Sequence, residues 1–191
     1  SFDIGTQGKG VGTAGQYTVK RSFFQFNVSG VSNITELTMS VYGNASGGGN
    51  VRAVKPTAAS FASGLGVEDF DAIEGFSAGN TMAGNVTDYS SEITTWSTSG
   101  YNDITLNSTA LTDMQNDDAF KIALINHDHD YKNVDPGINA SNLGGMYYTA
   151  YSGTSTDPII EYTLSGYGND VIGVASSDIG EVNTVATANI A

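Results

Sequence analysis

The sequence predicts an all-β protein built as an antiparallel sandwich. Three observations lead to this fold class: several segments alternate apolar and polar residues with a period of two, glycine occurs 24 times, and proline occurs only 3 times. Period-two alternation is typical of strands with one buried face, and frequent glycine allows the tight turns that join short strands. The chain has 191 residues and no cysteine, so it must bury a core without disulfides, which its length allows.

The strongest strand signal lies in residues 17–42, where two apolar stripes flank a turn of serine, glycine and asparagine. The stripes are Phe24, Phe26 and Val28, and then Leu37, Met39 and Val41. Upstream, Tyr17 and Val19 fall on the opposite parity. We therefore expect a bulge near residues 20–23, or a strand that is covered on both faces.

Weaker patterns occupy the rest of the first half. We expect a glycine-rich strand or arm over residues 1–15, a loop over residues 43–49 and a short strand over residues 50–55. Residues 58–84 are rich in small residues and predict irregular loops that send aromatic side chains into the core. Residues 86–96 have apolar residues at helical spacing, but their β-branched composition favours a strand or an extended segment.

The second half predicts one short helix between strands. Asn107 or Ser108 can cap a helix that ends near residues 116–118, because both side chains accept hydrogen bonds from backbone N–H groups. About eight to ten short strands joined by regular turns are typical of a sandwich of the jelly-roll type. The strands predicted in this half are residues 101–106, 119–126, 145–151 and 158–164.

One parity of the predicted strands carries large apolar residues. We expect these residues to be buried between two antiparallel sheets. They are Phe24, Phe26, Leu37, Met39, Val41, Phe120, Ile122, Leu124, Ile160 and Tyr162.

The net charge of −13, from 20 acidic and 7 basic residues, limits the partners. Such a chain repels phosphate backbones and anionic bilayers, so we do not expect nucleic-acid binding. The sequence shows no apolar run long enough for a membrane span, and no signal peptide is visible. We do not expect an enzyme, because no carboxylate pair, triad or activated nucleophile has a supporting context.

The densest group of candidate metal ligands follows the strand AFKIALIN. Asp128, Asp130 and Asp135 could supply oxygens to a calcium ion, although their spacing does not fit an EF-hand loop. His127 and His129 would share one face of an extended chain and could hold zinc, but no third ligand is apparent. A solvated acidic loop without a metal is the remaining interpretation.

Aromatic side chains could form platforms for sugars if they are exposed. Aromatic residues of a sandwich are more often in the core, so both interpretations stay open. The candidates for glycan contact are Trp96, Tyr131, Tyr147 and Tyr151, with Tyr101 and Tyr148 as further possibilities.

Several blocks of the sequence resemble a known group of modules. Arg21 leads an apolar strand, residues 103–107 read DITLN before the predicted helix, and residues 152–158 read SGTSTDP before the last strand. In these features the chain resembles the jelly-roll domains grouped as DNRLRE or carbohydrate-binding-module-like domains, which occur in secreted and surface proteins. The resemblance covers residues 17–164. It implies a jelly roll that serves as an appended module in many contexts.

The remaining residues contain an internal repeat at a spacing of 11 residues and resemble the ends of structural proteins of marine tailed bacteriophages. One and a half repeats cannot bury their own apolar faces, so we expect the tail to dock on another chain. We thus divide the chain into a jelly-roll domain, residues 1–165, and an assembly tail, residues 166–191, with a disordered linker as the alternative for the tail. The tail residues expected to contact another chain are Val171, Val174, Ile179, Val182, Val185 and Ile190.

The leading functional hypothesis is a non-enzymatic virion structural protein, either a capsid decoration or a fibre-type module. Its partners would be other virion proteins or copies of itself. The alternative is a carbohydrate-binding module of a secreted or cell-surface protein, with glycans as partners. Both hypotheses place the protein on a virion, outside the cell or on the cell surface.

Overall fold

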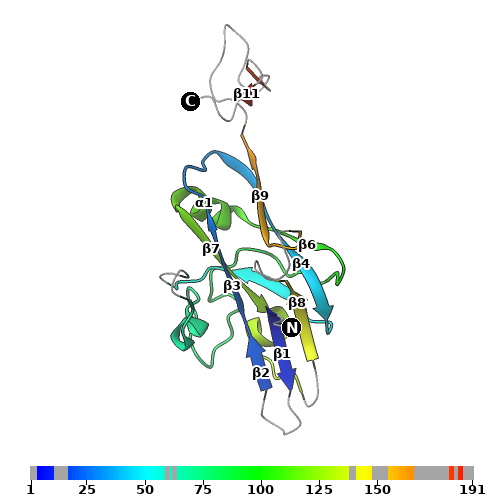
Figure 1. The fold of residues 1–191 in the computed structure, drawn as a ribbon. Coiled ribbons are helices and arrows are strands. Elements are labelled where there is room, and N and C mark those ends of the chain that lie inside the picture. The colour runs from blue at the N-terminus through cyan, green and yellow to red at the C-terminus, as the bar shows by residue number, and fades with distance from the viewer. Residues whose placement is uncertain are drawn as a thin grey trace.

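The computed structural model describes residues 4–10, 17–58, 61, 64–137, 141–147, 155–165, 181–182 and 185–186. Strands in antiparallel sheets dominate this part of the chain, with one α-helix and two short helical turns (Figure 1). The predicted all-β antiparallel class is therefore confirmed. The finer jelly-roll connection is not established by the strand order. No helix in the described ranges is long and apolar enough to cross a membrane.

The larger sheet contains six strands, in the order β2-β1-β8-β4-β6, with β9 also paired to β4. Their bounds are Ile4–Gly10 for β1, Tyr17–Lys20 for β2, Ile34–Ser46 for β4, Tyr101–Thr105 for β6, Ser141–Met146 for β8 and Ile159–Leu164 for β9. β6 and β9 lie on opposite sides of β4, because Thr38, Met39 and Ser40 pair with both strands. β4 is thus the central element of this sheet.

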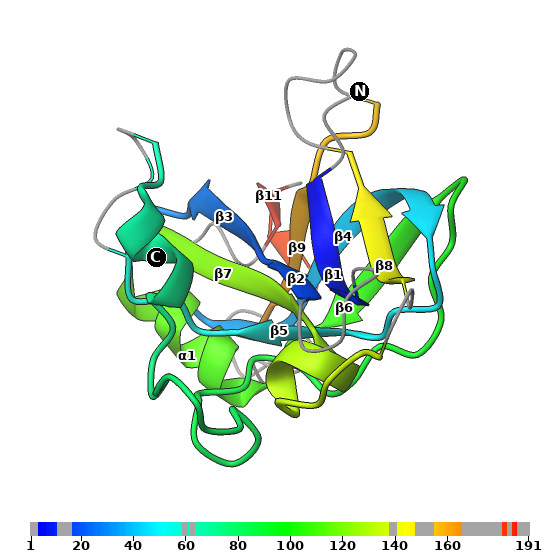
Figure 2. The ribbon, with the colours of Figure 1, turned by 90° about the horizontal axis from the view of Figure 1, so that it is seen from below.

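The smaller sheet has the order β3-β7-β5, with bounds Ser22–Asn27 for β3, Ala119–Asn126 for β7 and Val51–Val54 for β5. The chain leaves the larger sheet at the end of β2 and enters the smaller sheet at β3, and Arg21 is the residue between them. Figure 2 shows β2 beside β1 and β3 beside β7. This change of sheet explains why Tyr17 and Val19 have the opposite parity to Phe24.

The main core fills the space between the two sheets, and a second cluster covers the outer face of the smaller sheet. β7 is buried on both faces: Ile122 and Leu124 belong to the main core, whereas Ala123 and Ile125 belong to the second cluster. The second cluster is completed by Val54, Ile73, Met82 and Tyr131. A layer formed by residues 70–86 and the segment after β7 therefore covers the smaller sheet from outside.

Most of the predicted core residues are buried. The confirmed residues are Phe24, Leu37, Met39, Val41, Phe120, Ile122 and Leu124. Phe26 and Ile160 are half-buried and pack against the main core. The prediction for Tyr162 is wrong, because its side chain is 42% exposed. β9 pairs only with β4 among the described strands, so no neighbouring strand covers this long side chain.

The predicted helix is α1, Ser108–Asn116. Asn107 is its N-cap, and the Asn107 side-chain oxygen accepts hydrogen bonds from the backbone N–H groups of Thr109 and Ala110. Ala110 and Met114 are buried, so one face of the helix covers the end of the core. The cap satisfies two N–H groups that would otherwise lack an intrahelical partner.

Two segments differ from the sequence prediction, and a third agrees with it. β4 continues through residues 43–46, where a loop was expected. β8 begins at Ser141, before the strand predicted over residues 145–151, and ends at Met146, whereas residues 148–151 lie outside the described residues. β8 pairs with the end of β4, and the close approach of the two strands requires a glycine at position 145, since a Cβ atom there would lie 2.6 Å from the Asn44 Oδ1 atom. Residues 86–96 form isolated bridges to β5 and are otherwise irregular, consistent with an extended segment.

The loops of residues 58–84 send only some of their large side chains inward. Ile73 is buried and Phe76 is half-buried against the second cluster. Leu65 and Phe70, also expected as anchors, are 44% and 38% exposed. Phe70 lies in a short 3-10 turn, η1 (Val67–Asp71), where it packs on Arg21 and not into the core.

In the tail, the structure describes two short strands, β10 (Glu181–Val182) and β11 (Val185–Ala186). They pair with each other as a separate antiparallel sheet, with Val182 opposite Val185. The other predicted assembly residues, Val171, Val174, Ile179 and Ile190, lie outside the described residues.

Candidate functional site

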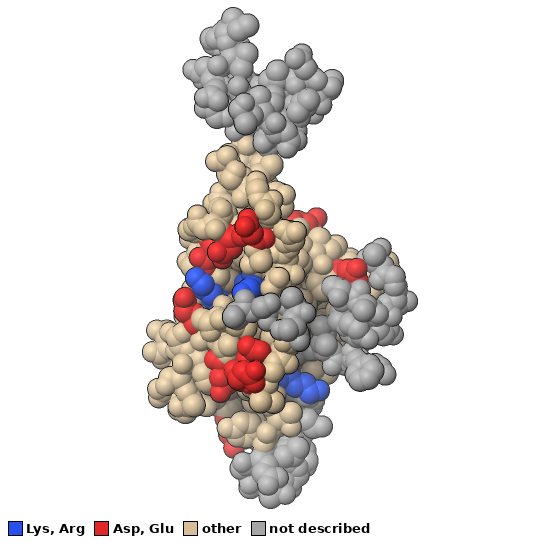
Figure 3. Space-filling model, turned by 60° about the vertical axis from the view of Figure 1, so that its left-hand side comes forward, with Lys and Arg blue, Asp and Glu red and all other residues tan. Residues whose placement is uncertain are grey.

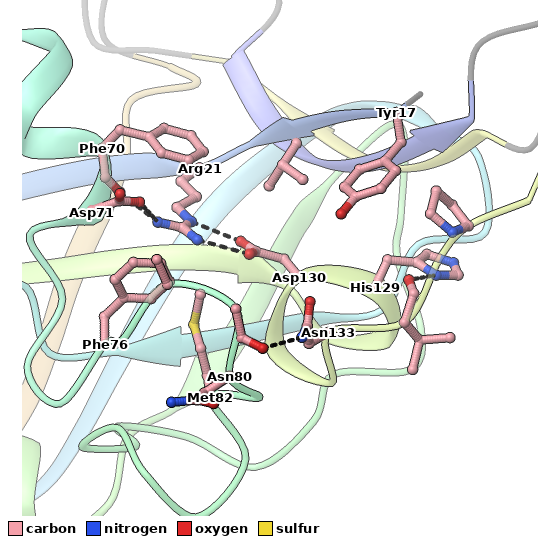
Figure 4. Close-up of a pocket in the computed structure, with 15 residues that line it drawn as sticks. Tyr17, Arg21, Phe70, Asp71, Phe76, Asn80, Met82, His129, Asp130 and Asn133 are labelled. Carbon is pink, nitrogen blue, oxygen red and sulfur yellow. Dashed lines mark hydrogen bonds and ion pairs between the residues drawn. The ribbon is translucent and has the colours of Figure 1, made fainter. Parts of the chain in front are cut away.

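A pocket of about 190 Å³ lies where β2 ends, beside η1 and a π-helical turn, η2 (His127–Tyr131) (Figure 4). Its walls come from four parts of the chain: the β2–β3 junction, η1, residues 76–82 and residues 129–136. The loops that cover the smaller sheet thus meet the end of the larger sheet at this point. The pocket is lined by apolar and polar side chains together.

Arg21 is the anchor of this pocket. Its Nε and Nη2 atoms donate to the two carboxylate oxygens of Asp130 at 2.8 and 2.9 Å. Its Nη1 atom donates to the backbone carbonyl of Phe70 at 2.6 Å and to Asp71 at 3.0 Å. The Arg21 side chain is only 4% exposed. A guanidinium with this many charge-assisted partners fixes the relative positions of β3, η1 and η2.

Two aromatic rings pack on the Arg21 guanidinium. The Arg21 Cζ atom lies 4.2 Å from the ring centroid of Phe70 and 4.8 Å from that of Phe76. These distances are those of cation–π contacts. The pocket wall formed by Arg21, Phe70 and Phe76 is therefore built before any ligand arrives.

The rim of the pocket is unusually apolar for a solvated surface. Tyr17 and Val134 are each 51% exposed, and Phe70 is 38% exposed. Leu65 and Val67, in or next to η1, are 44% and 94% exposed. Exposed apolar residues that gather in one place mark binding sites more often than single ones do.

A second polar network lies on the other side of η2. Arg52 donates from Nε to the Nδ1 atom of His127 at 3.0 Å and from Nη1 to Asp88 at 2.9 Å. The Nε2 atom of His127 lies 3.1 Å from a carboxylate oxygen of Glu92. Tyr131 donates its hydroxyl to Asp88 at 2.8 Å. The network ties β5, residues 88–92 and η2 together.

These contacts define the protonation state of His127. Because Nδ1 accepts a hydrogen bond from Arg52, the ring proton must be on Nε2, where it is donated to Glu92. The pKa of His127 lies below its ordinary value, chiefly because the ring is buried, with Arg52 and Lys132 lowering it further against the opposing effect of Glu92. His127 is thus neutral in the folded protein at neutral pH.

Glu92, His127 and Asp128 are the three side chains of the described chain whose ligand atoms lie close enough to share a metal ion. A metal on Nε2 would require the proton to move to Nδ1, where it would face the Nε–H group of Arg52. Metal-bound histidines ordinarily donate from the second nitrogen to a carboxylate or carbonyl, which is the reverse arrangement. The group therefore fits a hydrogen-bond network better than a metal centre.

The structure does not bring Asp128, Asp130 and Asp135 together as a calcium site. Asp130 is bound at both oxygens by Arg21. Asp128 lies 3.4 Å from Lys132, and Asp135 accepts a hydrogen bond from the backbone of Gly137 within its own turn. The three carboxylates form no common group in the described chain. Asp128 and Asp130 lie in η2 and have different partners, and Asp135 lies beyond η2 in a separate turn.

The zinc interpretation of His127 and His129 is corrected in the same way. The two residues lie in η2, not on one face of an extended strand. His127 contacts Arg52 and Glu92, whereas the Nδ1 atom of His129 lies 3.0 Å from the carbonyl of Val134. The two imidazoles are thus held by different partners.

The predicted glycan platforms are mostly parts of the fold. Tyr131 is only 5% exposed and its ring packs against both His127 and Arg52, so its prediction as a platform is wrong. Trp96 is half-buried against the main core and donates from Nε1 to the carbonyl of Gly145.

Tyr147 and Tyr101 are half-buried, and both rings pack on Tyr42. Tyr148 and Tyr151 lie outside the described residues. The aromatic residues at an open pocket are instead Tyr17 and Phe70, which the sequence reasoning did not single out as ligand contacts. One signal could have found the place: Arg21 is a basic residue between two apolar segments of opposite parity.

No model of a known protein family matches the chain, and a comparison with curated proteins finds no similar sequence.

Proposed function

We propose that the chain is a non-enzymatic structural module of a virion, which displays its β-sandwich and assembles through its C-terminal end. The observation that carries this proposal is the distribution of exposed large apolar side chains. In the described chain they occur in two places, around the Arg21 pocket and on β9. Exposed apolar patches mark interaction sites, so one place is available for contact with a partner and the other for assembly.

β9 supports the assembly role. Ile159 is 38% exposed and Tyr162 is 42% exposed, and the strand contains no lysine, arginine or proline within its sequence IIEYTL. Lysine and proline are among the devices by which edge strands avoid pairing with other chains. β9 is also the last strand before the tail, so an interface on β9 would continue into the tail.

The identity of the assembly is inferred from the sequence. The 11-residue repeat and its resemblance to tails of phage structural proteins support a virion component, a capsid decoration or a fibre-type module with a jelly-roll fold. The acidic, cysteine-free composition is compatible with this role. The second candidate is a carbohydrate-binding module of a secreted or surface protein, and the observation that favours it is the pocket with its exposed aromatic rim.

The experiment that tests the proposal is mass spectrometry of purified virus particles, carried out on fractions from a density gradient. We expect the chain to be found with the particles at a stoichiometry set by their symmetry. An abundant cellular protein, followed through the same gradient, controls for co-purification. If the chain is instead found only among secreted or cell-surface proteins, the virion proposal is wrong.

A further inference from the structure

We propose that the exposed surface of η1 binds a cationic, partly apolar segment of a different protein. This η1 surface consists of Leu65, Val67 and Phe70 together with the acidic Glu68 and Asp71. The inference deepens the proposed function and rests on it, because it names the chemistry of the partner at the first of the two exposed apolar places. It involves no residue of β9 or of the tail.

The apolar side chains of the η1 surface add nothing to the core. Val67 is 94% exposed, the highest value of any large apolar side chain in the described chain, and Leu65 is 44% exposed. Burial of these side chains against a partner would remove apolar area from water, which is favourable. Phe70 and Tyr17 continue the surface to the mouth of the Arg21 pocket, on different sides of Arg21 (Figure 4). One apolar side chain of a partner can enter this pocket as an anchor.

Hydrogen bonds at both ends of η1 fix this surface. At the start of the turn, the Gly66 N–H group donates to the Asp69 carboxylate at 2.9 Å, and the Asp69 N–H group donates to the Gly66 carbonyl at 3.2 Å. At its end, Arg21 donates to the Phe70 carbonyl and to the Asp71 carboxylate. A turn that is already fixed loses little conformational entropy when a partner binds. The exposed side chains of η1 are therefore presented in a defined arrangement.

The charge around η1 determines the sign of the partner. Within residues 64–73, Glu68, Asp69 and Asp71 are acidic and no residue is basic. The nearest cation, Arg21, is already neutralised by Asp71 and Asp130. The net charge of −13 has the same sign and acts at longer range. Lysine or arginine side chains of a partner are therefore attracted to this surface, whereas acidic proteins, nucleic acids and anionic membranes are repelled.

A second copy of the chain does not provide such a partner. The chain has only 7 basic residues, and Arg21, Arg52, Lys55 and Lys132 are already in ion pairs. On the face shown in Figure 3, acidic side chains cover more of the surface than basic ones. The partner that the η1 surface fits is therefore a different protein, with lysine or arginine next to apolar side chains.

The test begins with a yeast-displayed library of random dodecapeptides, which is selected for binding to the purified full-length chain. The enriched peptides are then synthesised and titrated against the chain by isothermal titration calorimetry. We expect these peptides to combine a net positive charge with apolar residues. Their affinity should fall as the salt concentration rises, because salt screens the attraction between exposed charges.

Two substitutions separate the apolar part of the η1 surface from its charged part. Val67→Ser and Glu68→Lys should each weaken binding of the enriched peptides by at least about tenfold. Both side chains are exposed and neither belongs to the ion pairs of Arg21, so the fold should be unchanged. Ile159→Ser and Glu161→Lys are the matched controls, because they make corresponding changes at exposed residues of β9. Both controls should bind like the unmodified chain.

The inference is wrong if no peptide is enriched, or if the enriched peptides are acidic or uncharged. It is also wrong if either η1 substitution leaves binding unchanged, or if the β9 controls weaken binding as much as the η1 substitutions do. A dimer of the full-length chain that Val67→Ser dissociates, measured by analytical ultracentrifugation, would assign the surface to a second copy instead. The proposed function is tested separately by the presence of the chain in virus particles, so the two failures are distinguishable.

Discussion

Arg21 connects the fold and the candidate site through one side chain. It stands where the chain passes from the larger sheet to the smaller one, so its backbone is fixed by both sheets. Its guanidinium bridges Asp130 of η2 to the Phe70 carbonyl and to Asp71, both in η1. A buried cation of this kind is tolerated because every charge around it is paired. The residue at which the chain passes from one sheet to the other therefore also forms the pocket wall.

We predict that Arg21→Ala lowers the free energy of unfolding by about 3 to 5 kcal/mol, the usual result of leaving one partner of a buried ion pair unpaired. Arg21→Lys should restore only part of the loss, because lysine cannot donate to both oxygens of Asp130 in the planar geometry of a guanidinium. Urea unfolding followed by circular dichroism measures both. Lys132→Ala is the control: it removes an exposed pair with Asp128 and should cost about 0.5 kcal/mol or less. Similar losses for Arg21→Ala and Lys132→Ala would show that Arg21 is not an anchor.

His127 predicts a pH dependence of stability. Its pKa in the folded protein is lower than its value of about 6.5 in the unfolded chain, mainly through burial. Between the two pKa values the unfolded chain binds more protons, so stability rises with pH there. The contribution is complete above about pH 6.5 and is lost as the pH falls toward the pKa of the folded state.

The measurement is urea unfolding between about pH 7.5 and about pH 5.5, above the range in which most carboxylates titrate. His127→Asn serves as the comparison, because the asparagine oxygen can accept from Arg52 in place of Nδ1 but does not titrate. We expect the unmodified chain to lose more stability on acidification than the variant does. Equal losses would mean that His127 does not have the lowered pKa.

At the scale of elements, the sequence was most informative where one face of a strand is buried. The alternation in β4, and that of Phe120, Ile122 and Leu124 on the inner face of β7, correctly predicted residues of the main core. The prediction failed in two situations. A second layer can bury the outer face of a strand, and a strand at the edge of a sheet can leave its side chains exposed. Ala123 and Ile125 are buried by loops whose path no local pattern reveals, and Tyr162 is exposed because β9 lies at an edge. The π-helical turn η2 has no period-two or amphipathic signal at all, so the ligand directions of Asp128 and Asp130 could not be predicted.

The cap of α1 gives a prediction at this scale. Asn107 accepts two backbone hydrogen bonds from the helix and donates from Nδ2 to the carbonyl of Asp88 at 2.7 Å. Asn107→Ala removes all three and should lower the free energy of unfolding by about 1 to 2 kcal/mol. Asn107→Asp keeps the cap but loses the donor, so its loss should be smaller. Thermal unfolding of the two variants provides the comparison. If both variants lose the same stability, the effect comes from the hydrogen bond to the Asp88 carbonyl and not from the helix cap.

The molecule as a whole has two separate places where large apolar side chains are exposed. The rim of the pocket combines Tyr17 of β2 with loops that cover the smaller sheet, whereas Ile159 and Tyr162 belong to β9, an edge strand of the larger sheet. The sequence predicted an assembly role for the tail that follows β9, but its alternation indicated that Tyr162 is in the core, so it did not predict the second place. It could not predict the first, because Tyr17, Phe70 and Val134 are far apart in the chain and meet only through Arg21 and η2. A site assembled from loops leaves little trace in local patterns.

The last prediction concerns the tail and the assembly. Among the described strands, β10 and β11 pair only with each other, so removal of residues 166–191 leaves every strand of the larger and the smaller sheet with its partners. We therefore expect the truncated chain to be folded and soluble, with an unchanged circular dichroism spectrum, but unable to join its particle or oligomer. Size-exclusion chromatography with light scattering, and occupancy in purified particles, measure the loss.

A full-length variant with Val182→Asp and Val185→Asp separates the apolar positions from the length of the tail. Both valines recur in the 11-residue repeat, and a charge at either position would oppose burial against another chain. The double variant should therefore assemble as poorly as the truncated chain. If the truncated chain still joins its particle with unchanged occupancy, the tail is only a linker, and the exposed side chains of β9 must carry the interface alone.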